Sequence, residues 1–459
     1  MQNFWGSEVW GLVDLIAVLL LSLIAANIIK RRVKWMRESL VPTSVLGGIL
    51  LLVVAGIYDL ITGDVMFETG FFGGNGYEVM EIITYHALGL GFIASSFKAS
   101  GGKLNKQRTV EIFNTGVTTV STYLLQAVVG FGITLLVAVF VKDFFAAAGV
   151  LLPFGYGQGT GQALNYGTIY ETQFGFDGGK TFGLTIAAFG FLSASIGGVV
   201  HLNILKKQKK ITVIPEDERP TITEPVETEN EIPMQGSMDK LTVQVAFVAG
   251  AYLLTYLLMF LLGLLLPGMK SVIYGFNFLL GVLAATLVKL TVNTMYRKQV
   301  IHHQYINDFL MTRISNFCFD VMVVAGIAAI RLGVLGKYWP VLLVLGIVGL
   351  FVTYWYNRVV AKKLFPAYAE EQFLMMYGML TGTASTGVIL LREIDGNFQT
   401  PAADNMVYQN FPAIVFGFPM MLLATLAPQR PLLTLIILVL FFIAMNLLLF
   451  RSWIFRKRK

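Results

Sequence analysis

Long apolar runs alternate with short polar segments along almost the whole chain. A run of about 17–25 apolar residues is long enough to cross ~30 Å of hydrocarbon as a helix, whereas a barrel strand needs only ~10 alternating residues. The pattern therefore predicts an all-α polytopic membrane protein. The predicted membrane helices occupy residues 11–29, 43–60, 82–97, 110–141, 181–204, 241–266, 271–293, 316–332, 338–358, 405–427 and 431–450.

Two further apolar segments, 144–173 and 373–392, are interrupted near their middles by Gly and Thr. Each limb has about ten residues, which as a helix covers ~15 Å, half the hydrocarbon depth. We predict that each segment enters and leaves the membrane on one side as a re-entrant hairpin. The hairpin at 144–173 would enter from outside and that at 373–392 from the cytoplasm, so that their tips meet about halfway across.

The order of these elements repeats along the chain. Residues 1–205 and 241–427 each predict five membrane helices plus one hairpin, and Gly159-Thr160-Gly161 of the first hairpin aligns with Ser385-Thr386-Gly387 of the second. Five crossings separate the halves, so the pattern predicts two inverted-topology repeats. Residues 206–240, with four prolines and many acids, predict a cytoplasmic linker. Residues 428–459 predict one additional C-terminal helix and a basic tail.

The composition agrees with a membrane protein and excludes a soluble globular one. Hydrophobic residues make up 56% of the chain and charged ones 13%, against roughly a quarter in soluble domains. The single cysteine, Cys318, excludes an intrachain disulfide and disfavours a thiolate metal site. The first apolar run begins near Gly11 without a basic segment before it, which predicts a retained helix and no cleaved signal peptide.

The basic residues determine the predicted orientation. Lys and Arg in short loops remain on the cytoplasmic side of a membrane protein. With the N-terminus outside and the C-terminus cytoplasmic, the loops around residues 30–37, 98–108, 206–210, 297–298 and 358–363 and the tail 456–459 are cytoplasmic, and all are rich in Lys and Arg. The net charge of +7 therefore reflects topology in a cell (inner or plasma) membrane and not nucleic-acid binding.

The two interrupted segments carry the candidate chemistry. Irregular backbone at membrane depth is tolerated only where it is buried in protein or lines a wet cavity. Exposed N–H groups at the start of a half-helix suit a carboxylate, and carbonyl and hydroxyl oxygens suit a hard cation such as Na⁺. The alternative is that these glycines only pack helices together. The predicted substrate contacts are Gly157, Gln158, Gly159, Thr160, Gly161, Asn165, Thr383, Ser385, Thr386, Gly387 and Arg392.

The predicted cation ligands are Thr160, Thr381, Thr383, Ser385, Asn316 and Asp320. Asp320 lies early in the predicted helix 316–332, where an ionisable residue is a candidate cation ligand or proton carrier. The alternative is that Asp320 is hydrated near the helix end or pairs with Arg313. Arg392 could clamp a carboxylate or serve only as a cytoplasmic topology determinant, and Asn165 could contact substrate or only pack.

The chain resembles the sodium/glutamate symporter family. The matching pieces are Val41-Pro42-Thr43-Ser44-Val45-Leu46-Gly47-Gly48, the glycine-rich residues 155–161, Ala188-Phe189-Gly190 and the second tip at 382–387, and the similarity covers most of residues 11–427. The resemblance implies a homodimer whose mobile domain carries substrate in an elevator motion, with both tips forming the substrate and Na⁺ sites. Tyr156 and Gln158 interrupt the family's usual first tip, Gly-Gly-His-Gly-Thr, and the second tip has fewer glycines than usual.

These observations predict a sodium-coupled secondary transporter that imports an acidic amino acid, L-glutamate first, with Na⁺ as coupling ion and no cofactor. A symporter of another small organic anion such as a dicarboxylate, driven by Na⁺ or by protons, remains an alternative. A channel lined by the two hairpins is a further one. We do not expect an enzyme, because the chain has no HExxH motif and no paired carboxylates within its predicted helices.

Overall fold

The computed structural model describes residues 4–98, 105–208, 226, 230–396 and 399–454, and within these residues it is helical with a single isolated β-bridge between Glu231 and Gln304. The α-helices of the first half are α1 (Ser7–Arg32), α2 (Lys34–Glu38), α3 (Thr43–Thr62), α4 (Gly76–Ser96), α5 (Lys106–Phe140), α6 (Leu151–Phe174) and α7 (Gly179–Lys207). Those of the second half are α8 (Lys240–Leu265), α9 (Lys270–Gly275), α10 (Asn277–Arg297), α11 (Asp308–Ala328), α12 (Leu332–Leu364), α13 (Ala369–Thr381), α14 (Ala384–Arg392), α15 (Ala402–Tyr408), α16 (Asn410–Leu426), α17 (Pro431–Leu449) and α18 (Arg451–Ile454). Short 3-10 turns occupy Met66–Glu68, Gly70–Phe72, Ala146–Val150, Pro267–Met269 and Pro366–Tyr368.

Ten helices of the described chain are long and apolar enough to cross a membrane, and an eleventh candidate is a bent pair. The ten are α1, α3, α4, α5, α7, α8, α10, α11, α12 and α17, and each covers most of a span predicted from the sequence. The sequence therefore predicted a polytopic helical membrane protein correctly.

Two predicted spans are broken in the structure. The span 271–293 begins as the short helix α9, ends at Phe276 and restarts as α10. The span 405–427 is a pair, Ala402–Tyr408 and Pro412–Leu426, bent by 54°. Pro412 explains this second break, because proline lacks the N–H that a continuous helix would use and crowds the preceding turn.

Local side chains explain where several helices begin. Asn105 accepts a hydrogen bond from the Arg108 N–H at the start of α5, and Asn307 accepts one from Leu310 N–H at the start of α11. Both are N-caps that satisfy backbone donors without partners in the first turn. The Asn307 cap places the start of α11 eight residues before the predicted span at 316, which matters for Asp320 below.

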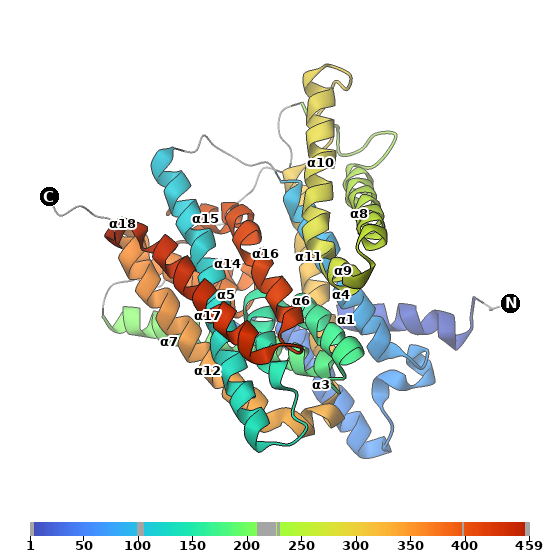
Figure 1. The fold of residues 1–459 in the computed structure, drawn as a ribbon. Helices are drawn as coiled ribbons and strands as arrows, with labels where there is room; N and C mark the ends of the chain where they lie inside the picture. The colour runs from blue at the N-terminus through green and yellow to red at the C-terminus, as the bar shows by residue number, and fades with distance from the viewer. Residues whose placement is uncertain (1–3, 99–104, 209–225, 227–229, 397–398, 455–459) are drawn as a thin grey trace.

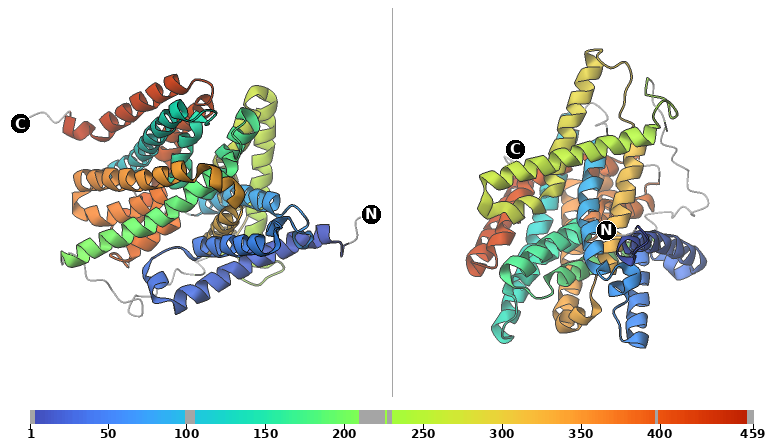
Figure 2. Two further views of the ribbon diagram at one scale, coloured as in Figure 1. Left: turned by 90° about the horizontal axis from the view of Figure 1, so that it is seen from below. Right: turned by 90° about the vertical axis from the view of Figure 1, so that its right-hand side faces the viewer.

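The helices pack in two groups, and the same division is visible in Figures 1 and 2. The first, called here the α4/α11 group, contains α1, α3, α4, α8, α10 and α11. The second, the α5/α12 group, contains α5, α6, α7, α12, α13, α14 and α17. Figure 1 shows α5, α12 and α17 side by side, with α8, α10 and α11 on the other side of the molecule. The groups meet where α6 contacts α4 and α11.

Candidate functional site

The first glycine-rich segment reverses the chain direction at Gly159. The helix α6 has helical backbone angles on both sides of this residue, but Gly159 has φ 76° and ψ −170°. Glycine alone adopts this backbone region readily, because it has no Cβ. As a result the rings of Phe154 and Tyr166 stack with their centroids 3.8 Å apart. A continuous helix would separate these residues by about 18 Å along its axis, so the two limbs lie side by side.

The second interrupted segment also places two limbs against each other. Gly382 separates α13 from α14, with φ −140° and ψ −108°. A Cβ atom placed on Gly378 of α13 would lie 2.8 Å from the Gly387 Cα of α14, and one on Gly387 would lie 2.5 Å from the Met375 carbonyl oxygen. These contacts are with backbone, which cannot move aside for a side chain. Glycine is therefore required on both limbs for this close packing.

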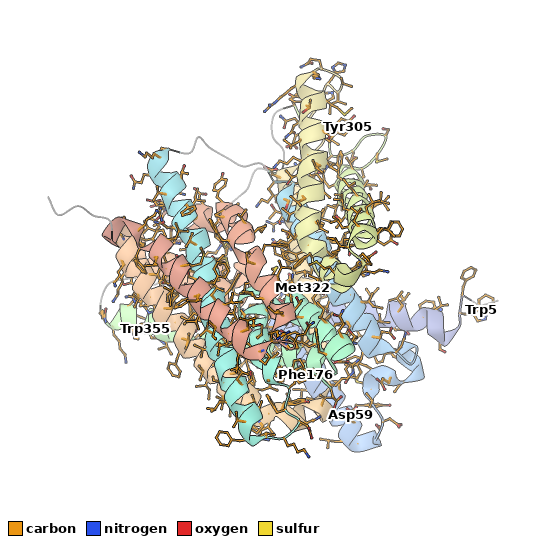
Figure 3. All side chains as sticks on the ribbon, viewed as in Figure 1. Trp5, Asp59, Phe176, Tyr305, Met322 and Trp355 are labelled. Atoms are coloured by element: carbon orange, nitrogen blue, oxygen red, sulfur yellow. The ribbon has the colours of Figure 1, made fainter. Side chains whose placement is uncertain are left out.

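The two tips meet inside the molecule. A Cβ atom on Gly159 would lie 3.5 Å from Thr383 Cγ2 and 3.9 Å from Met322 Cε. The Thr160 hydroxyl donates a hydrogen bond to the Met322 carbonyl oxygen at 3.2 Å. Figure 3 places Met322 near the middle of the bundle, between Tyr305 toward one end and Asp59 toward the other. Both tips and the middle of α11 thus form one junction deep in the protein.

A small cavity of about 220 Å³ lies beside the second tip, between the two helix groups. Its wall from the α4/α11 group carries Lys30 at the end of α1, Thr43 and Ser44 at the start of α3, and Asp320 of α11. Its wall from the α5/α12 group carries Phe191 of α7, Thr383 and Ser385 of the second tip, and Ile389 of α14. Pockets for drug-sized ligands measure roughly 300–1,000 Å³, so this volume suits a small metabolite.

The structure brings only some of the predicted substrate residues to the cavity. Thr383 and Ser385 line it directly. The Gln158 Nε2 atom, at the first tip, is buried without a hydrogen-bond partner. Asn165 is buried and donates to Gln162 Oε1 and to the Gly275 carbonyl oxygen, both at 3.2 Å, and Arg392 lies exposed at the far end of α14. Neither of these two lines the cavity.

Gly157 and Gly161 are packing positions. A Cβ atom on Gly157 would lie 2.1 Å from Tyr123 Cε1, and the Tyr123 hydroxyl donates to the Gly157 carbonyl oxygen at 2.9 Å. A Cβ atom on Gly161 would lie 2.8 Å from Leu88 Cδ1. These glycines therefore let α5 and α4 approach the first tip closely.

Hydroxyl groups that suit a hard cation gather at the second tip. The Thr383 and Thr386 hydroxyl oxygens are 3.3 Å apart. Thr381 is buried, and its hydroxyl donates to the Tyr377 carbonyl oxygen at 2.6 Å. Gln126 of α5 stabilises the backbone just before this tip. Its Nε2 donates to the Leu380 carbonyl oxygen at 2.9 Å and to Thr353 Oγ1 at 2.8 Å. Within the described residues no three His, Cys, Asp or Glu side chains gather as a metal site.

Asp320 lies deeper in its helix than the sequence indicated. Because α11 begins at Asp308, Asp320 is about three turns into the helix. Its side chain is exposed and lines the cavity beside the Ser44 side chain. The alternative pairing with Arg313 is not observed, since that guanidinium lies over the Phe309 ring, 5.0 Å from its centroid. Asn316, one turn earlier, is exposed and does not line the cavity.

Sequence reasoning missed Lys30, Thr43, Ser44 and Phe191 as cavity residues. Lys30 was interpreted only as a topology determinant, and Thr43 and Ser44 were part of a family motif without an assigned role. A usable signal was present, because Thr and Ser directly after Pro42 open a membrane helix with hydroxyl groups. Phe191 carried no comparable signal.

A bundle of helices long and apolar enough to cross a membrane, with two glycine-broken segments in contact beside a small cavity, defines the class of multi-pass membrane proteins. The family model for the sodium/glutamate symporter matches residues 11–369. The match covers most of the chain, and the protein therefore belongs to the sodium/glutamate symporter family. It ends at Ala369, the first residue of α13, so the second tip lies outside the matched residues. No curated protein matches the chain.

Proposed function

We propose that this protein is a symporter that couples the entry of Na⁺ to the import of L-glutamate by alternating access. Family membership implies Na⁺-coupled glutamate transport. The observation that carries the proposal is the cavity beside the second tip. Its walls come from two different helix groups and include one basic and one acidic side chain, Lys30 and Asp320. A site between two groups can open to either side when one group moves against the other.

The mobile part in this proposal is the α5/α12 group, which contains both tips and would carry the substrate in an elevator motion. The α4/α11 group would form the scaffold of a homodimer, as the resemblance to the family implies. The inverted repeat is supported by the packing of matched helices, because α4 lies against α11 and α5 against α12. The stacked limbs of α6 and the packed limbs of α13 and α14 support two re-entrant hairpins that enter from opposite sides.

Each tip has a distinct role in the proposal. The backbone N–H groups at the start of α14, next to Ser385 and Thr386, bind a substrate carboxylate, because a helix N-terminus favours negative charge. The hydroxyls of Thr160 and Thr383 contribute oxygen ligands to Na⁺. Gly159, with its positive φ, lets the first tip turn beside the second. The N-terminus lies outside and the C-terminus in the cytoplasm, with the basic loops inside.

The membrane potential drives import only if more than one Na⁺ enters with each glutamate. Moving a monoanion inward against an inside-negative potential costs ~2.3 kcal/mol per 100 mV. One Na⁺ cancels this electrical cost, and a second makes import electrically favourable. We therefore propose at least two Na⁺ ions per substrate.

The test is uptake of radiolabelled L-glutamate into proteoliposomes with and without an inward Na⁺ gradient. The wild type is compared with Gly159→Val and with Gly175→Val as a matched control. Both glycines have positive φ, but a Cβ on Gly175 meets no atom within 4 Å, whereas Gly159 faces Thr383. Accumulation that needs Na⁺, is lost in Gly159→Val and persists in Gly175→Val supports the proposal. A folded wild type without Na⁺-dependent uptake contradicts it, and uptake of a dicarboxylate instead favours another organic anion.

A further inference from the structure

Asp320 lies in a membrane helix and lines the cavity with an exposed side chain, and it forms no salt bridge with any residue that the structure describes. Ser44, which lines the same cavity, is a polar side chain beside it. A charged group at membrane depth is costly and is normally paired with an opposite charge. A carboxylate without such a partner, at the wall of a cavity, therefore points to a cationic ligand.

A basic side chain, Lys30, lines the same cavity. The Lys30 ammonium group lines it and donates a hydrogen bond to the Val41 carbonyl oxygen at 2.6 Å. The first turns of α3 and α14 also reach the cavity through Ser44 and Ser385, and neither helix has a side-chain N-cap hydrogen bond. The positive ends of these helix dipoles add to the charge of Lys30. The cavity thus has one negative and one positive pole.

We propose that Asp320 binds the α-ammonium group of the substrate, so that it selects an amino acid over a dicarboxylate of the same length without an amine. The carboxylates of the same substrate then face Lys30 and the first turn of α14. This inference rests on the proposed function and names the chemical group by which the site distinguishes its substrates.

A Na⁺ ion explains the cavity less well than a zwitterionic substrate. A bare cation makes no favourable interaction with Lys30 or with the helix N-termini. An amino acid has carboxylates for these positive groups and an ammonium group for Asp320. Na⁺ also needs several oxygen ligands. The hydroxyls of Thr383 and Thr386 lie together at the second tip, which suits Na⁺ there and leaves Asp320, beside Ser44, for the ammonium group.

The test compares L-glutamate with glutarate, which has both carboxylates and no amine. Proteoliposomes with the wild type, Asp320→Asn, Asp320→Glu or Asp14→Asn are assayed for the KM of glutamate, for inhibition of glutamate uptake by glutarate and for the half-saturating Na⁺ concentration. Asp14 is the matched control, because it is also a carboxylate in a membrane helix but does not line the cavity. Folding of each variant is checked by gel filtration.

We expect Asp320→Asn to raise the KM of glutamate by about ten- to a hundredfold, the range for a lost hydrogen bond to a charged group. The preference for glutamate over glutarate falls by a similar factor, while the half-saturating Na⁺ concentration stays close to that of the wild type. Asp320→Glu retains the preference in part, and Asp14→Asn behaves as the wild type. A higher half-saturating Na⁺ concentration with unchanged discrimination overturns the inference and assigns Asp320 to Na⁺.

A thermal-shift measurement on the detergent-purified protein separates this inference from the proposed function. A wild type that transports neither compound contradicts the proposed function. The inference still stands if glutamate stabilises the wild type more than glutarate does and this difference disappears in Asp320→Asn. It fails if both compounds stabilise the wild type equally, or if glutarate is the better ligand.

Discussion

Lys180 Nζ lies 2.8 Å from Glu81 Oε2, and this ion pair joins the start of α7 to the start of α4. Arg331, in the connection between α11 and α12, binds the other oxygen of the same carboxylate. Glu81 therefore pairs with two basic side chains, Lys180 of α7 and Arg331. The Glu81 side chain is 9% exposed. The helix α3 runs from the cavity at Thr43 toward this end of the bundle at Thr62. The ion pair therefore joins the two groups at the end away from the cavity.

The first prediction concerns the ion pairs at this end of the bundle. We expect Glu81→Gln to favour the conformation that is open there, because Lys180 and Arg331 lose a shared, largely buried carboxylate. Removing one partner of such a pair costs about 1–3 kcal/mol when the other is left without its charge-assisted hydrogen bond. The measurement is labelling of Ser385→Cys, in a Cys318→Ser background, by a membrane-impermeant thiol reagent added outside. Glu81→Gln should raise the labelling rate severalfold.

The exposed ion pair between Lys337 and Asp177 provides the control. Its nitrogen and oxygen are 3.0 Å apart, but the two side chains are 58% and 80% exposed. An exposed pair contributes little to stability, since water solvates both charges. Asp177→Asn should therefore leave the labelling rate unchanged. An equal effect of both substitutions would show that general loosening, and not the Glu81 pair, controls access.

The second prediction concerns the glycine contact between the limbs of the second tip. Gly378→Ala places a methyl group 2.8 Å from Gly387 Cα, which forces the limbs apart. Overpacking of this kind costs about 1–3 kcal/mol. We expect a lower apparent melting temperature and loss of most glutamate uptake. Gly132→Ala in α5 is the control, because a Cβ there meets no atom within 4 Å. If both variants transport equally, close packing of the limbs is not required.

The third prediction concerns Gln126, whose side chain holds the backbone before the second tip. Gln126→Leu leaves the buried Leu380 carbonyl oxygen without its 2.9 Å donor, at a cost of about 1–3 kcal/mol. We expect a lower maximal uptake rate and a higher half-saturating Na⁺ concentration. Thr353→Val keeps the hydrogen bond from Gln126 Nε2 to the Leu380 carbonyl oxygen and removes only the one from Gln126 Nε2 to Thr353 Oγ1 at 2.8 Å. Its effect should therefore be smaller. The reverse order of effects would contradict the proposed role of Gln126.

The fourth prediction follows from the charge carried in each cycle. Two Na⁺ ions with one glutamate monoanion move one net positive charge inward, which an inside-negative potential favours by ~2.3 kcal/mol per 100 mV. A K⁺ diffusion potential of that sign, set with valinomycin, should increase Na⁺-driven accumulation. Accumulation that does not change with the imposed potential would exclude a stoichiometry of two or more.

Long apolar runs determined most of the helices by themselves, because only hydrophobic segments of this length can span a bilayer with their backbone groups satisfied. The sequence also showed that Gly159 interrupts an apolar segment, since the apolar residues on each side of it are too few to cross the membrane. The breaks at Phe276 and Pro412 were not predicted. An apolar window averages over such a local break, and so hydropathy alone does not reveal it.

Only the tertiary structure decided which side chains share the cavity. Lys30, Ser44, Asp320 and Ser385 come from four helices that are far apart in sequence, and hydropathy carries no information about which helices become neighbours. The same limit explains why the sequence could not show that Asn165 donates a hydrogen bond to the Gly275 carbonyl oxygen, or that the Tyr123 hydroxyl donates one to the Gly157 carbonyl oxygen. Helix formation depends on local backbone and on the surrounding solvent, whereas a binding site depends on packing between distant segments, and that packing is resolved only when the chain is folded.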